Sequence, residues 1–132
     1  MKIISKILLA GILSLGVANA DDVMKTSMTK MDTGMNMIQK GFMHNSMDLI
    51  RDGLKMVEEG NKMFSDKKTI AMYLPKDKQH MVNVAAKQSE RITLDASVLG
   101  LRLDDKAYTS AANAYSDMLN ACSRCHAIVR DW

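Results

Sequence analysis

The chain has 132 residues, 47% of them apolar and 25% charged, and its formal net charge is +3. This balance indicates one globular domain, and it excludes the strongly basic surface of a nucleic-acid-binding protein. One proline and seven glycines are too few for the turns of a small all-β fold, and two cysteines cannot form a disulfide framework.

Residues 1–20 have the features of a secretory signal peptide. Two lysines lie near the start, a short apolar stretch follows, and Ala18-Asn19-Ala20 is typical of a cleavage site. The apolar stretch is shorter than the roughly 20 residues that an uncleaved membrane anchor needs. We therefore expect cleavage after Ala20 and a periplasmic domain of residues 21–132, which meets the membrane only before cleavage.

Two helices are expected between residues 22 and 64, because apolar residues recur there at alternating steps of three and four. Gly41 to Asn45 is predicted to end the first helix, and Asn45 to cap the second. The apolar seam of the first helix consists of Met24, Met28, Met31, Met35, Ile38 and Phe42. The seam of the second consists of Met47, Ile50, Leu54, Val57 and Phe64, interrupted by polar Asn61.

Two more helices are expected after a polar connection over residues 65–76. Asp77 is predicted to cap the third helix and Asp104 the fourth. The third helix has a weaker seam, formed by Met81, Val84, Ile92 and Leu99. The seam of the fourth consists of Tyr108, Ala111, Tyr115, Met118, Cys122, Cys125 and Val129.

The predicted fold class is all-α, an up-down-up-down antiparallel four-helix bundle. The short links make helices 1 and 2, and helices 3 and 4, antiparallel neighbours. A core rich in methionine and alanine is soft and poorly specified. With almost no phenylalanine or tryptophan available, we expect a bulky prosthetic group to fill the middle of the bundle.

The string Cys122-Ser123-Arg124-Cys125-His126 is the attachment motif of a c-type haem. On a helix, Cys122 shares one face with Cys125 and His126, at spacings of three and four residues. The two thiols can therefore bond to two vinyl groups along one haem edge, while the imidazole binds the iron. We expect one covalently bound haem c, enclosed by the bundle.

Three other interpretations of the two cysteines are open. A redox-active disulfide is more typical of a helix N-terminus after a strand. Zinc needs a fourth ligand, and the other histidines, His44 and His80, are isolated and predicted to lie on the surface at the far end of the bundle. A structural disulfide closing so short a loop gains little stability and leaves His126 unexplained.

A lone C-x-x-C-H in the last helix of a secreted four-helix bundle resembles the cytochrome c′ and cytochrome c556 family. The specific likeness lies in Cys122-x-x-Cys125-His126-x-x-x-Arg130, although Val129 replaces the usual aromatic residue. The resemblance implies that Cys122 and Cys125 attach the haem, that His126 is an axial iron ligand, and that Arg130 lies near the proximal side. The other reading of Arg130 is a solvated cation at a helix C-terminus.

The sixth iron ligand is expected on the first helix. Counting from the helix ends places Met28 and Met31 at the depth of His126, and the resemblance favours Met31, with Met28 as runner-up. In one branch of the family a methionine closes this site, and in the other the site stays open to small gases.

The expected function is that of a periplasmic electron carrier, which exchanges single electrons with redox partner proteins. Lys25, Lys30 and Arg124 are candidates for steering those partners. The alternative is a five-coordinate cytochrome c′ that binds NO or CO, and a third reading is a haem-free copper chaperone. No motif indicates an enzyme. The resemblance also suggests a homodimer through the first two helices, with Met37, Met43 and Met56 as candidate contacts.

Overall fold

The computed structural model describes residues 20–130, and within that range the protein is helical and contains no strand, so the all-α prediction is confirmed. Five α-helices and one 3₁₀ helix follow one another along the chain: α1 (Ala20–His44), α2 (Met47–Met63), α3 (Lys67–Tyr73), η1 (Lys76–Met81), α4 (Val82–Asp104) and α5 (Tyr108–Arg130). The predicted signal peptide lies outside the described residues except for Ala20, which begins α1. No helix in the described range is long and apolar enough to cross a membrane.

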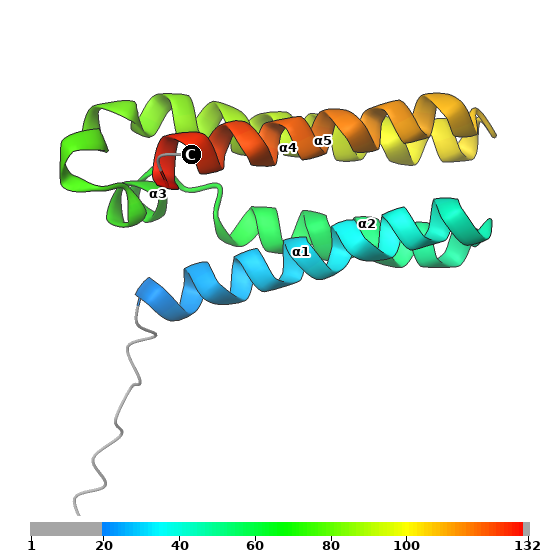
Figure 1. Ribbon diagram of the computed structural model, residues 1–132, viewed down its shortest axis with the longest axis horizontal. Coiled ribbons are helices and arrows are strands. Elements are labelled where there is room, and N and C mark those ends of the chain that lie inside the picture. Colours follow the sequence, from blue (N-terminus) through cyan, green and yellow to red (C-terminus); the bar gives the residue numbers. More distant parts are fainter. Residues whose placement is uncertain (1–19, 131–132) are drawn as a thin grey trace, which may run out of the picture.

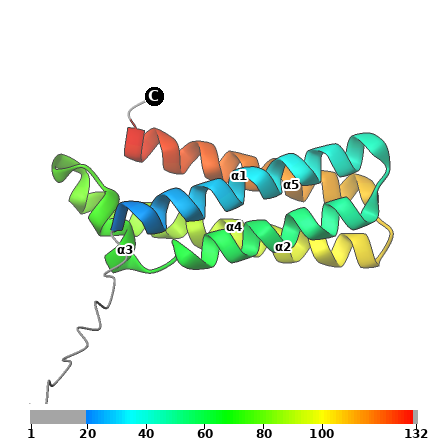
Figure 2. The same ribbon diagram turned by 90° about the horizontal axis from the view of Figure 1, so that it is seen from below.

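The four long helices form two antiparallel pairs, the α1–α2 hairpin and the α4–α5 hairpin, which lie one above the other (Figure 1). Seen from below, α1 lies over α5 and α2 lies over α4 (Figure 2). Both tight turns lie at one end of the molecule, whereas α3 and η1 connect the hairpins at the other end. The start of α1 and the end of α5 therefore both lie at the end of the molecule that holds the long connection (Figure 1).

The two tight turns begin and end elsewhere than the sequence predicted. Helix α1 runs through Gly41 to His44, and Asn45 adopts a left-handed φ of 54°, so Ser46 rather than Asn45 caps α2. At the other turn, Asp104 is the last residue of α4 instead of the cap of the next helix. Small or polar residues mark both turns, but the spacing alone did not show which of them takes the capping position.

The connection between the hairpins is more ordered than predicted. Residues 67–73 form helix α3, capped by Asp66, where the sequence suggested a loop. Asp77 does not cap α4, because it lies in η1 and α4 begins only at Val82. The backbone N–H of Met24 donates to the hydroxyl oxygen of Tyr73 over 3.2 Å, which ties the start of α1 to the end of α3.

Glycines bring α1 and α2 into unusually close contact. A Cβ atom added to Gly34 would lie 2.5 Å from the carbonyl oxygen of Gly53, and one added to Gly53 would lie 2.6 Å from that of Gly34. Two turns closer to the start of α1, the buried hydroxyl of Ser27 donates to the carbonyl oxygen of Gly60 over 2.7 Å. The α1–α2 hairpin is therefore held backbone to backbone, with little side chain between its helices.

The interior consists of two apolar clusters. The larger one runs along the middle of the four long helices and includes Ile38, Ile50, Leu99 and Met118, all fully buried. The smaller one lies at the end that holds α3; its buried members are Phe64, Ile70, Leu74, Ala85, Ala86 and Cys125. Most seam positions of the first, second and fourth predicted helices are buried or half-buried, whereas Val84 of the third is 43% exposed.

Candidate functional site

A cavity of about 400 Å³ lies between the two hairpins, in the half of the molecule that holds the end of α5. Its wall is mostly apolar and comes from four helices, α1, α2, α4 and α5. Ligand cavities in proteins typically span about 300–1,000 Å³ and have apolar walls with a few polar groups. This cavity therefore has the size and the lining of a binding site for a flat apolar molecule.

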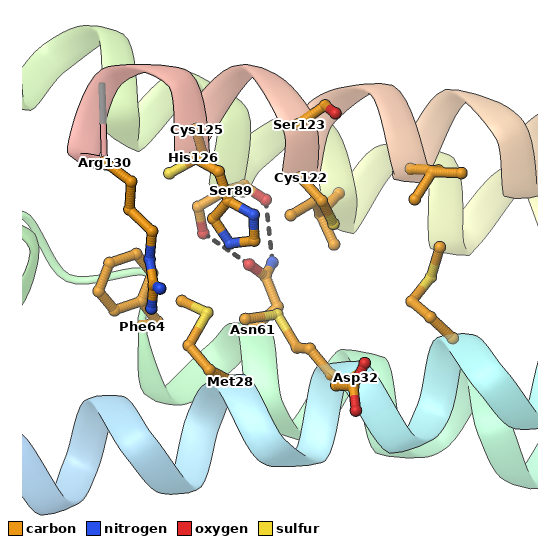
Figure 3. Close-up of a pocket in the computed structure, with 14 residues that line it drawn as sticks. Met28, Asp32, Asn61, Phe64, Ser89, Cys122, Ser123, Cys125, His126 and Arg130 are labelled. Atoms are coloured by element: carbon orange, nitrogen blue, oxygen red, sulfur yellow. Dashed lines mark hydrogen bonds between the residues drawn. The ribbon is translucent and has the colours of Figure 1, made fainter. Parts of the chain in front are cut away.

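The C-x-x-C-H motif lies on α5 and lines this cavity. Cys122, Cys125 and His126 all contribute to the wall, and the imidazole extends from α5 toward the opposite hairpin (Figure 3). Their spacing of three and four residues places them on one helical face, as the sequence predicted. Neither cysteine takes part in a disulfide.

The surroundings of the thiols favour their neutral form. Burial raises the pKa of the Cys122 thiol to about 11, and it raises the pKa of Cys125 as well. A reactive dithiol depends on a lowered pKa, which a helix N-terminus or a neighbouring cation provides. The two thiols instead lie in the last turns of α5, so the geometry speaks against a redox-active disulfide.

The surroundings of His126 favour the form that binds metals. Burial lowers the pKa of its imidazole, and the positive charge of Arg130 lowers it further. A lowered pKa favours the neutral imidazole, which is the form in which histidine binds metals. Arg130 lies one turn beyond the histidine, lines the same cavity, and extends toward Phe64, the residue that follows α2 (Figure 3).

Helix α1 lines the cavity with three methionines. Met31, the residue favoured by sequence, is 7% exposed, and the runner-up Met28 is half-buried. In Figure 3 the side chain of Met28 extends from α1 toward the helix that carries His126. Met35, one turn further along α1, also lines the wall. All six candidate site residues thus share one cavity, and the structure adds a third thioether to the choice of sixth ligand.

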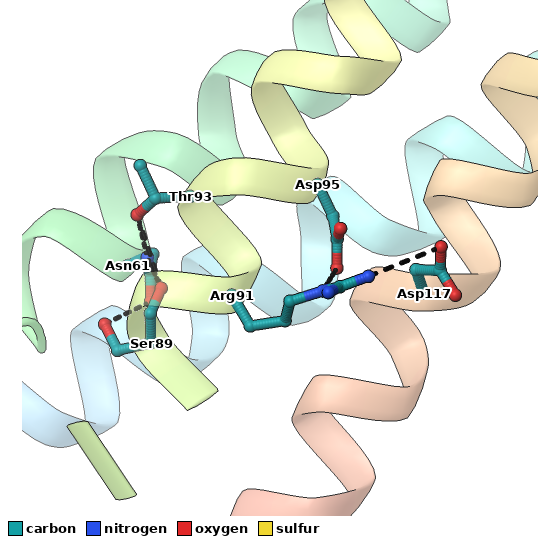
Figure 4. A network of polar contacts seen from close by, with 6 residues as sticks. All are labelled: Asn61, Ser89, Arg91, Thr93, Asp95 and Asp117. Carbon is teal, nitrogen blue, oxygen red and sulfur yellow. Dashed lines mark hydrogen bonds and ion pairs between the residues drawn. The ribbon is translucent and has the colours of Figure 1, made fainter. Parts of the chain in front are cut away.

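The sequence did not identify two buried polar residues of the cavity wall. Asn61 of α2 and Ser89 of α4 line the cavity, and both are buried. The Asn61 side chain is hydrogen-bonded to Ser89 and to Thr93, which joins the two hairpins (Figure 4). The signal for Asn61 was present, because it is the one polar residue in the seam of the second helix.

The remaining histidines lie outside the cavity. His44 and His80 are both exposed, as predicted, but His80 is not at the far end: it lies in η1, which packs against α5. Within residues 20–130, no three His, Cys, Asp or Glu side chains gather in a way that could hold a metal ion. A haem iron does not require such a cluster, because the protein supplies only its axial ligands.

Comparisons with protein families, with curated proteins and with solved structures found no match to this chain.

Proposed function

We propose that residues 21–132 form a four-helix-bundle cytochrome of the cytochrome c′ and c556 type, which carries one covalent haem c and transfers single electrons in the periplasm. One observation carries this proposal: both free cysteines and the adjacent histidine line the same apolar cavity as the methionines of α1. A sulfur pair, an imidazole and an opposing thioether are the groups that attach and ligate haem in c-type cytochromes.

The residues around the cavity fit a haem in chemistry as well as in size. The wall is mostly apolar, which suits a macrocycle, and the lowered pKa of His126 favours the neutral imidazole that binds metals. The raised pKa values of Cys122 and Cys125 keep both thiols protonated before attachment. Cys122 and Cys125 would hold the haem through two thioether bonds, and addition of each S–H bond across a vinyl group would need no oxidant.

Haem iron supplies the electron chemistry, since it accepts one electron from a donor protein and passes it to an acceptor. The protein holds the group and excludes water from it. His126 ligates from α5, and we propose Met31, or Met28 in its place, as the ligand from α1. A thioether ligand stabilises ferrous iron and raises the reduction potential.

Redox partners would dock where α1 and α5 border the cavity. Lys25 of α1 and Arg124 of α5 are exposed, whereas the ammonium group of Lys30 lies 2.9 Å from a carboxylate oxygen of Glu59 on α2. Lys30 is thus partly neutralised, which leaves Lys25 and Arg124 as the better candidates to steer a partner.

The proposal is tested by producing the full chain together with a c-type haem maturation system. The purified product should gain the mass of one haem and should stain for haem on a denaturing gel, because only a covalent group survives denaturation. Replacing both Cys122 and Cys125 by alanine should abolish the stain. A wild-type product that carries no haem would overturn the proposal.

The sixth ligand is tested by the absorption spectrum of the loaded protein. A ferric sulfur-to-iron charge-transfer band should be present, and CO should leave the ferrous spectrum unchanged. Met31→Ala should remove the band, or Met28→Ala or Met35→Ala if one of those residues is the ligand, while Met43→Ala, which lies outside the cavity wall, serves as the control. High-spin bands and a rapid CO shift in the wild type would instead support the five-coordinate, gas-binding alternative.

A further inference from the structure

A buried amide interrupts the apolar wall of the cavity. Asn61 is 2% exposed and Ser89 is 4% exposed, and each lies on an inward face whose neighbours are apolar. Burying such groups disfavours folding unless every hydrogen bond is formed, and an apolar pair could fill the same space. Their presence at this wall calls for an explanation beyond packing.

Asn61, Ser89 and Thr93 form a hydrogen-bond network, and every polar hydrogen of these side chains is donated within it. The amide nitrogen of Asn61 donates to the backbone oxygen of Ser89 and to the hydroxyl oxygen of Thr93, both over 2.9 Å. The Ser89 hydroxyl donates to the amide oxygen of Asn61 over 2.9 Å, and the Thr93 hydroxyl donates to the backbone oxygen of Ser89 over 3.3 Å. An asparagine amide has two hydrogens and a hydroxyl has one, so none is left over.

What the network can present to the cavity is therefore oxygen lone pairs. Asn61 and Ser89 line the cavity, whereas Thr93 lines only a second hollow of about 360 Å³ between α2 and α4, which Asn61 borders as well. The amide oxygen and the serine hydroxyl oxygen each keep a free lone pair. In a mostly apolar wall, these oxygens act as a local concentration of negative partial charge.

We propose that Asn61 and Ser89 lower the reduction potential of the haem through the negative partial charge of their side-chain oxygen atoms. This inference rests on the function proposed above. Negative partial charge beside the iron stabilises the ferric state, which carries one more positive charge than the ferrous state. The effect opposes that of a thioether ligand, which favours ferrous iron, and that of the cationic Arg130 at the same cavity.

The test measures the midpoint potential of the haem-loaded protein by spectroelectrochemistry. The main variant is Asn61→Leu with Ser89→Ala, which removes both polar partners together and so leaves neither side chain unpaired. Its potential should rise, so that the ferrous-to-ferric ratio at a fixed electrode potential increases by about tenfold. The matched control is Thr93→Val, which removes one hydrogen bond to Asn61 but changes no residue of the cavity wall; its stability should fall while its potential stays that of the wild type.

Each result decides between the alternatives. An unchanged or lower potential in the double variant overturns the inference while leaving the haem assignment intact. A rise of equal size in Thr93→Val also overturns it, because loosening of the fold would then explain both. If the double variant does not fold, Asn61→Leu alone is measured, in which the Ser89 hydroxyl can turn to the carbonyl four residues earlier. A wild-type protein without haem refutes the proposed function and the inference together.

Discussion

Gly34 on α1 tests how closely the α1–α2 hairpin is packed. A methyl group at this position would meet three atoms of α2: the carbonyl oxygen of Gly53 at 2.5 Å, a methyl carbon of Val57 at 2.8 Å and the backbone nitrogen of Val57 at 2.9 Å. Two of these atoms belong to the backbone and cannot rotate away. Gly34→Ala should therefore force the two helices apart.

The size of the effect follows from two opposing contributions. Alanine is the better helix former, which favours the variant by about 1 kcal/mol. Ordinary contacts of a Cβ atom lie at 3.4–4 Å, so the helices would have to separate by about 1 Å along much of their contact. Overpacking of this kind costs about 1–3 kcal/mol, and more where backbone must move. We expect a net loss of about 1–2 kcal/mol in the free energy of unfolding.

Gly100 on α4 provides the matched control. An added Cβ there would meet only a terminal methyl carbon of Leu54, at an ordinary distance of 3.5 Å. Gly100→Ala should therefore stabilise the protein by about 0.5–1 kcal/mol. Urea unfolding followed by circular dichroism would measure the free energy of unfolding of both variants. In thermal unfolding, their Tm values should differ by roughly 10 °C. If Gly34→Ala were as stable as Gly100→Ala, the close packing described here would be wrong.

The reciprocal contact gives a further check. Because one separation of the helices relieves the clashes at both Gly34 and Gly53, the double alanine variant should lose less free energy than the sum of the two single variants. Full additivity would show that the two glycines act independently.

Two further predictions concern charged groups. A hydrogen bond from the backbone N–H of Thr69 lowers the pKa of Asp66 below its ordinary value of 3.8. The carboxylate therefore stabilises the fold above pH 3.8, and this contribution is lost as the pH falls below it. Asp66→Asn should keep the cap but lose this pH dependence; if urea unfolding at acid pH showed the same loss of stability in the variant as in the wild type, the reasoning would be wrong. Asp95 is 3% exposed and bonded at 2.8 Å to Arg91, whose side chain is 51% exposed (Figure 4). Arg91→Met leaves the buried carboxylate of Asp95 without this ion pair, whereas Asp95→Leu leaves a guanidinium that water can solvate. Arg91→Met should therefore lower the free energy of unfolding more than Asp95→Leu; the reverse order in chemical denaturation would refute this.

Much of the helical architecture could be predicted from the sequence. The steps of three and four that ran through Ile50, Leu54 and Val57 identified a helix and its buried face, and all three side chains are buried. The C-x-x-C-H spacing placed its three residues on one face of the last helix, and the structure puts them at one cavity. These features could be predicted because they depend on periodicity within a single helix.

Features that depend on contacts between distant segments could not be predicted. Helix α3 is short and polar on most of its surface, and only Ile70 is buried, so periodicity gave no signal for it. Asn61 was visible as a polar interruption, but its partners Ser89 and Thr93 lie on another hairpin. The glycines of α1 and α2 add nothing to the apolar pattern of either helix, so no sequence pattern indicated that they let two backbones meet.

The glycine contact also determines where the molecule can yield. With backbone against backbone at Gly34 and Gly53, α1 and α2 cannot move closer together. What can change shape is the set of unbranched side chains, Met28, Met31 and Met35, that α1 presents to the cavity. A fixed backbone that carries flexible side chains lets this wall adapt to a guest while the distance between the two helices stays constant.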